Sequence, residues 1–124
     1  MLQAYSTDID VAAQAAIPFN NLSLQKGCTA KLSSPATIQL NKCGVYMVAV
    51  DGSAAASVNI ELYKDGVAQP QAQSEGLNPS FVTLVQVDHN NSNCCCCDSP
   101  VNLQVIADTA ATFSNVNITV TKVC

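Results

Sequence analysis

Charge is scarce in this sequence of 124 residues. Only 11% of the residues are charged, against about 25% in typical soluble domains. All five cations are lysines, arginine is absent, and the formal net charge is −4. A nucleic-acid-binding surface needs a basic patch, so this composition excludes nucleic acid as a partner. It also leaves much of the surface to be covered by amides, hydroxyls or another subunit.

Sequence signatures of membrane insertion, secretion and catalysis are also missing. The sequence has no apolar run near the roughly 20 residues that a membrane-spanning helix needs, so no membrane partner is expected. Residues 1–16 lack a basic region and carry Asp8 and Asp10, so we expect no secretory signal peptide and synthesis in a cytosol. A Gly-rich phosphate loop, a Gly-x-Ser-x-Gly motif and a metal-binding His pair are all absent. The nine carboxylates are scattered, and we expect no enzymatic activity.

One uncharged run, Gly44–Val50, organises the rest of the chain. Its apolar residues occupy odd and even positions alike, which predicts a strand covered on both faces. Residues 81–87 show the same pattern and are expected to form a second interior strand. Because the core of one subunit covers one face of such a strand, we expect a partner subunit to cover the other.

Elsewhere apolar and polar residues alternate with a period of two, which predicts short strands and no helix. The Asp65-Gly66 pair between two alternating runs predicts a tight hairpin turn. About eight to ten strands at regular spacing are typical of an antiparallel sandwich or barrel. The expected strands cover residues 22–25, 28–32, 37–41, 44–50, 58–63, part of 69–78, 81–87, 101–105 and 115–121.

Within the amino-terminal residues 1–15, Leu2–Tyr5 could form a short edge strand, and the residues from Asp8 onward allow two interpretations. Asp8 would cap a helix over residues 8–16, which are rich in Ala and Gln. The alternation of Ile9, Asp10 and Val11 favours an extended arm instead. We therefore expect an arm over residues 1–15 and a single β domain over residues 16–124.

Four stretches, in this order, resemble the trimeric jelly roll shared by tumour necrosis factor and the complement-type globular head. The likeness is to its bacterial and bacteriophage branch, which includes the carboxy-terminal heads of collagen-like spore-surface glycoproteins. The first stretch begins at Ala16 and the last ends at Val123. The stretches are AIPFN (16–20), ATIQLNKCGVYMVAV (36–50), VNIELYKDGVAQP (58–70) and VNITVTKV (116–123).

The resemblance implies a TNF-like homotrimer that buries one sheet face of each subunit near a three-fold axis. It implies no catalytic residue, since members of this family act as ligands, heads or coats. The sequence lacks a collagen-like stalk, which favours a decoration or head-fibre protein on the virion surface of a phage, bound to a coat or fibre protein. The alternative is a carbohydrate- or receptor-binding head on a phage or a spore surface.

Seven cysteines form the sharpest local feature, and an odd number cannot all pair within one subunit. Disulfides, reduced thiols and a zinc site in the 94–97 loop with His89 as a ligand all remain open. A nucleophilic Cys–His pair is disfavoured, because residues so close on one loop are rarely preorganised. The candidate cysteines are Cys28, Cys43, Cys94, Cys95, Cys96, Cys97 and Cys124.

The aromatic residues and the valines beside them are expected in the core or at the trimer interface. Tyr63 is different, because it falls on the polar parity of its strand and is a candidate surface contact for a glycan or a protein. Aromatics clustered with Asn and Asp in one pocket would favour the carbohydrate-binding alternative. The expected core or interface residues are Tyr46, Val48, Val50, Phe81, Val85 and Phe113.

Overall fold

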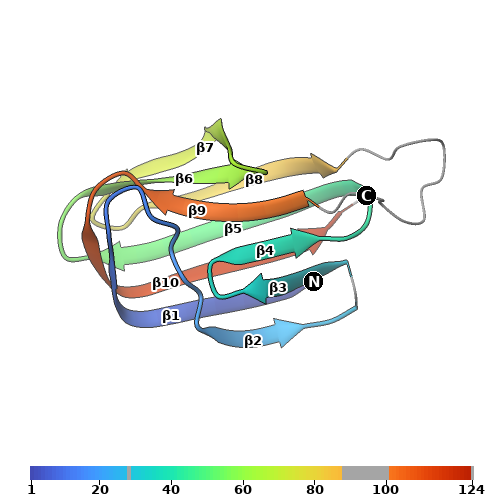
Figure 1. Cartoon of the computed structure of the whole chain (residues 1–124), viewed down its shortest axis with the longest axis horizontal. Coiled ribbons are helices and arrows are strands. Elements are labelled where there is room, and N and C mark those ends of the chain that lie inside the picture. Colours follow the sequence, from blue (N-terminus) through green and yellow to red (C-terminus); the bar gives the residue numbers. More distant parts are fainter. Residues whose placement is uncertain (28, 88–100, 124) are drawn as a thin grey trace.

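The chain folds into two antiparallel five-stranded sheets packed face to face (Figure 1). A computed structural model describes residues 1–27, 29–87 and 101–123. This described part is all β, so it has no helix with the length and apolarity to cross a bilayer. The strands are β1 (Leu2–Val11), β2 (Asn21–Gln25), β3 (Ala30–Ser34), β4 (Thr37–Leu40), β5 (Gly44–Ala54), β6 (Val58–Lys64), β7 (Val67–Gly76), β8 (Ser80–Val87), β9 (Val101–Ala107) and β10 (Ala111–Lys122).

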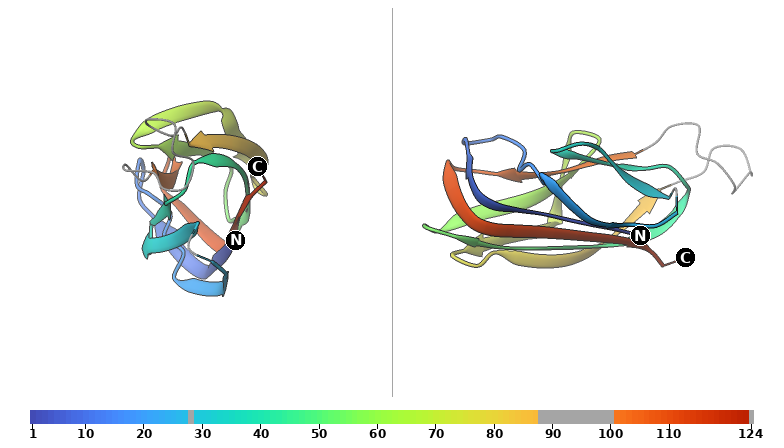
Figure 2. Two further views of the ribbon diagram at one scale, coloured as in Figure 1. Left: turned by 90° about the vertical axis from the view of Figure 1, so that its right-hand side faces the viewer. Right: turned by 90° about the horizontal axis from the view of Figure 1, so that it is seen from below.

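The strand order identifies the fold as a jelly roll. Sheet A has the order β2-β1-β10-β5-β8, and sheet B has the order β3-β4-β9-β6-β7. The chain crosses from one sheet to the other several times, as the perpendicular views show (Figure 2). The central strand β5 lies between β10 and β8, and all pairings are antiparallel. The sequence-based prediction of an antiparallel jelly-roll sandwich is confirmed.

The core lies between the two sheets and follows from the period of two. Along β8, for example, buried and exposed residues alternate without a break. Each fully buried Val, Leu, Ile or Phe side chain contributes about 1.5–3 kcal/mol to folding. The six residues expected in the core or at the interface are all buried in this core: Tyr46, Val48, Val50, Phe81, Val85 and Phe113.

Strand β8 differs from the prediction. We expected residues 81–87 to form an interior strand, but β8 is the edge strand of sheet A. Its inward residues reach the core, whereas Val82 and Leu84 point outward and are 68% and 61% exposed. Apolar residues at both odd and even positions therefore indicate two apolar faces of β8, and no described residue covers the outer one.

The amino-terminal segment also differs from the prediction. Residues 1–15 were expected to form an arm outside the domain, but β1 lies inside sheet A between β2 and β10. The segment is extended rather than helical, and a positive φ of 51° at Asp8 interrupts its alternation. Buried residues occupy even positions before Asp8, whereas Val11 is buried after it. The alternation is therefore broken, and the sequence indicated a possible strand over Leu2–Tyr5 but not the full length of β1.

The Asp65-Gly66 hairpin is confirmed. Asp65 and Gly66 have φ values of 51° and 82°, and Lys64 pairs with Val67 across the turn. Two successive positive φ values are what a two-residue turn of this kind requires, and Asp-Gly tolerates them well. The turn fixes where the Asp65 carboxylate stands at the end of sheet B.

Replacing Ser6 with Ala should destabilise the domain. The Ser6 side chain is 1% exposed, and its Oγ donates to the Pro18 carbonyl and accepts from the Asn20 N–H, both at 2.7 Å. The variant leaves two backbone groups without a partner, so the free energy of unfolding should fall by about 1–3 kcal/mol in urea titrations. The exposed Ser23→Ala should stay within about 0.5 kcal/mol. Equal stabilities for both variants would contradict an integral role for β1.

Candidate interaction surfaces

The outer face of sheet A carries a band of exposed apolar side chains over β5 and β8. Val82 lies opposite Ala49, and Leu84 lies opposite Met47, on the face turned away from the core. Ala49 and Met47 are half-buried, while the two β8 residues are mostly exposed. We call these four residues the apolar band. Exposed apolar side chains that lie together on one face make this band a candidate interaction surface.

Beside the apolar band the same face becomes polar. Thr119 pairs with Ala49 on one side and with Gln3 on the other, so the face continues over β10 and β1. A hollow of about 680 Å³ lies where the apolar and polar halves meet. Asp51 is its one charged lining residue within the described part of the chain. The hollow is lined by Gln3, Ala49, Val50, Asp51, Ser80, Phe81, Val82, Asn117 and Thr119.

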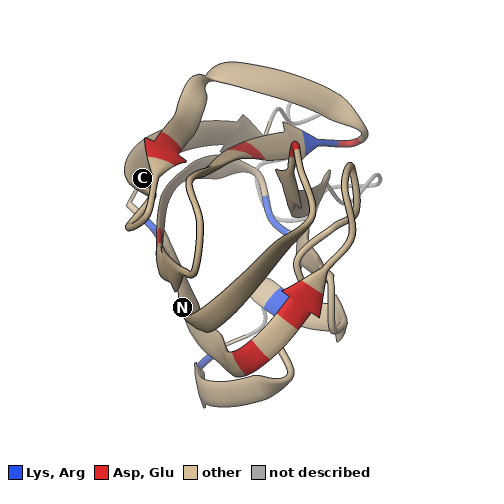
Figure 3. Ribbon diagram, turned by 90° about the vertical axis from the view of Figure 1, so that its left-hand side faces the viewer, with Lys and Arg blue, Asp and Glu red and all other residues tan. Residues whose placement is uncertain are grey.

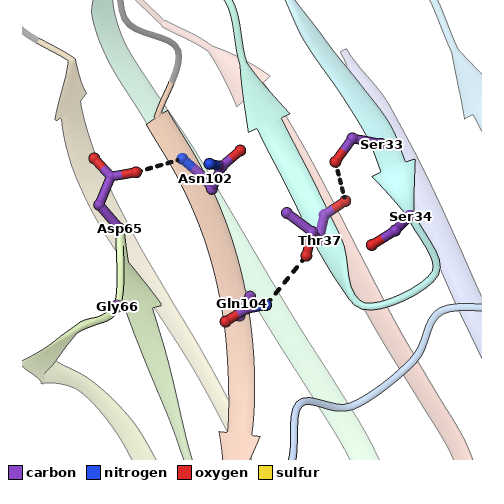
Figure 4. A pocket seen from close by; sticks show the side chains of 7 residues that line it. All are labelled: Ser33, Ser34, Thr37, Asp65, Gly66, Asn102 and Gln104. Carbon is purple, nitrogen blue, oxygen red and sulfur yellow. Dashed lines mark hydrogen bonds between the residues drawn. The ribbon is translucent and has the colours of Figure 1, made fainter.

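The outer face of sheet B has a different chemistry. A hollow of about 460 Å³ lies over β9, between the β6–β7 turn and the β3–β4 hairpin (Figure 4). Apart from Gly66, every described residue that lines it carries a hydroxyl, an amide or a carboxylate. We call it the polar hollow. It is lined by Ser33, Ser34, Thr37, Asp65, Gly66, Asn102 and Gln104.

Hydrogen bonds hold the walls of the polar hollow in place. Asp65 Oδ1 accepts from the backbone N–H of Asn102 at 2.8 Å, and the Asp65 N–H donates to the Asn102 carbonyl at 2.8 Å. On the other side Gln104 Nε2 donates to Thr37 Oγ1 at 3.1 Å. The first contact ties the β6–β7 turn to β9, and the second joins β9 to β4, so the sheet holds the polar groups on both sides of the hollow.

Tyr63 stands next to the polar hollow. It lies on β6 directly opposite Gln104 on β9, and it is half-buried. Opposite residues in an antiparallel pair have Cβ atoms about 5 Å apart on the same face. The sequence indicated Tyr63 as a surface contact, because it falls among the polar positions of its strand. Asp65 was predicted only as a turn residue, and Asn102 and Gln104 only as polar positions of a strand.

The Lys and the Asp or Glu residues of the described chain are distributed over several elements, and residues of both signs occur in the ribbon of Figure 3. The described residues also contain no group of three His, Cys, Asp or Glu side chains close enough to hold a metal. Cys43 is buried at the start of the central strand. The predictions for Cys28, His89, Cys94–Cys97 and Cys124 lie outside the described residues, so the pairing and zinc hypotheses stay predictions.

Comparison with solved structures identifies the fold. The chain is similar to the crystal structure of rabbit GITRL, with a TM-score of 0.63 and 8% identity over 100% of this chain and 95% of that one. The chain therefore has a tumour-necrosis-factor-like jelly-roll fold. No family model matches the sequence, and no curated protein matches it.

Two weaker likenesses were also found. The chain is similar to the protein YXIM of Bacillus subtilis, with a TM-score of 0.42 and 21% identity over 96% of this chain and 32% of that one. It is also similar to CBM35 of Paenibacillus barcinonensis, with a TM-score of 0.37 and 15% identity over 97% and 94% of the two chains. These TM-scores are low, and we draw nothing from them.

Replacing Gly66 with Ala should lower stability through the backbone alone. An added Cβ would meet no atom within 4 Å, but φ is +82°. A left-handed conformation costs a residue with a Cβ about 1–2 kcal/mol, so unfolding in urea should become easier by that amount. Gly66→Asn is the matched control, because Asn adopts this conformation more readily. Equal losses for Ala and Asn would show that the backbone conformation is not the cause.

Proposed function

We propose that this chain is a non-enzymatic head or decoration domain that works as a homotrimer on the outside of a phage particle. The observation that carries the proposal is the apolar band on sheet A. Val82 and Leu84 are mostly exposed on an edge strand. An edge strand with exposed apolar residues invites association unless something covers it.

Covering the apolar band would contribute substantially to the free energy of association. Each large apolar side chain contributes about 1.5–3 kcal/mol when it is fully removed from water. Asp51 is the nearby charge that lines the adjoining hollow, so association of this face buries little charge. This matters because an unpaired buried charge opposes association strongly.

A second copy of the chain is the occupant that fits this face. The face has two unlike halves, the apolar band over β5 and β8 and the polar half with its hollow over β10 and β1. A contact between unlike halves is heterologous, and a closed ring of such contacts satisfies every subunit. Members of the family that the sequence resembles close this ring with three subunits, which supports a trimer.

The role follows from a passive assembly. A closed trimer would hide the apolar faces, protect the β8 edge and present sheet B outward. The sequence resemblance to the phage branch of the family supports a place on the virion surface, bound to a coat or fibre protein. Mass spectrometry of the purified phage particles should detect the chain. Its absence from the particles would move the proposal to the spore-surface setting.

Charges placed on the apolar band should dissociate the trimer. In sedimentation at micromolar concentration, the wild-type chain should run at three times its 12.9 kDa mass. The double variant Val82→Lys and Leu84→Lys should run as a monomer. A trimer of this variant would have to bury six lysines, two from each of its three chains.

The matched control is Val67→Lys. Val67 is 63% exposed, like Leu84, but it lies on β7 of sheet B. This variant should remain trimeric. A monomeric wild-type chain, or a control variant that dissociates as the double variant does, would overturn the proposed assembly.

A further inference from the structure

The polar hollow on sheet B has the composition of a binding site for a neutral, polyhydroxylated ligand. Its walls come from three separate parts of the chain, the β3–β4 hairpin, the β6–β7 turn and β9 (Figure 4). The volume of about 460 Å³ lies within the range of about 300–1,000 Å³ found for small-molecule sites. It is large enough for a short saccharide.

The hydrogen-bonding capacity of the hollow is only partly used. Asp65 Oδ1 is engaged by Asn102, but among the described residues Oδ2 accepts no hydrogen bond. Gln104 uses its Nε2 on Thr37 and keeps its Oε1 as an acceptor. Ser34 adds a hydroxyl on the opposite wall. Sugar hydroxyls both donate and accept, so this mixture of acceptors and donors is complementary to them.

Other classes of ligand fit this set of residues poorly. A phosphate or another anion would meet the Asp65 carboxylate, and no lysine is among the described residues that line the hollow. Ca²⁺ takes six to eight oxygen ligands, commonly including several carboxylates, and Asp65 is the one carboxylate among the described residues that line this site. An apolar ligand would find no Val, Leu, Ile, Met or aromatic side chain among the described wall residues. A neutral saccharide avoids all three conflicts.

Tyr63 supplies the apolar surface that a sugar ring needs. Its position opposite Gln104 puts the Tyr63 side chain on the same face of sheet B, beside a lining residue of the hollow although Tyr63 itself does not line it. An aromatic ring offers a flat apolar face to C–H groups and a hydroxyl at its tip. The hollow and Tyr63 together give the combination of a stacking surface beside several hydrogen-bonding groups.

We propose that the polar hollow, together with Tyr63, binds a short neutral saccharide. The site faces away from the core on sheet B, whereas the proposed trimer contact lies on the outer face of sheet A. Binding at a single site therefore does not depend on the proposed trimer. A trimer would add avidity on a surface that displays many copies of the saccharide.

The direct test is to screen the wild-type protein on an array of neutral and acidic glycans. The neutral mono- or disaccharide unit of the strongest hit is then titrated while backbone amide resonances are followed by NMR. The largest shifts should fall on Gly66, Asn102 and Gln104. Shifts confined to another surface, binding of acidic glycans alone, or a silent array with no shift from glucose, galactose or N-acetylglucosamine would each overturn the proposal.

Two variants then test the residues. Tyr63→Ala and Gln104→Ala should each weaken binding by about tenfold or more, because each removes a side chain that contacts the ligand directly. Both residues are half-buried on the outer face, and urea titration checks that the variants fold. Asn59→Ala is the matched control, because Asn59 lies on the same strand and face about 13 Å from Tyr63. An equal loss with Asn59→Ala would contradict the site.

The double variant Val82→Lys and Leu84→Lys separates this proposal from the trimer. If both are right, it should keep the affinity for the free saccharide and lose only the avidity seen on the array. If the wild-type chain is monomeric and still binds, the saccharide site stands without the proposed assembly. Loss of binding to the free saccharide in the double variant would place the site on sheet A and overturn the inference.

Discussion

The structure depends on one constraint, that each strand of a sandwich can give only one of its two faces to the shared core. Both sheets fill that core with alternating apolar residues, and the sheets differ in what they place on the other side. Sheet A exposes Val82 and Leu84, while sheet B exposes amides and hydroxyls around Gln104. The same alternation thus produces one face suited to association and one suited to polar recognition.

The sequence correctly predicted those structural elements that depend only on neighbouring residues. The Asp65-Gly66 turn and the central strand at Gly44–Val50 were both found, because turn chemistry and strand alternation are encoded within a few residues. The position of β8 at the edge of sheet A could not be predicted from neighbouring residues. Apolar residues on both parities report two apolar faces, but not whether a neighbouring strand lies on each side.

The polar hollow shows the same limit for a functional site. The sequence marked Tyr63 as an exposed aromatic, but it could not bring Asp65, Asn102 and Thr37 together. Those residues meet because β9 lies between β4 and β6 in sheet B, and strand order is a long-range property. The positive φ at Asp8 is a further example, because the buried positions of β1 change parity across this residue, and residues 1–15 were therefore predicted to form an arm.

The position of β10 has a consequence for synthesis. This last strand lies between β1 and β5, so sheet A stays in two pieces until residues 111–122 have left the ribosome. Pairing β1 with β10 closes a loop of about one hundred residues, a topology that slows folding. During that delay the apolar strands of the nascent chain are exposed, and they are vulnerable to aggregation or to a chaperone. A ribosome that stalls before β10 would therefore release a chain without a complete sandwich.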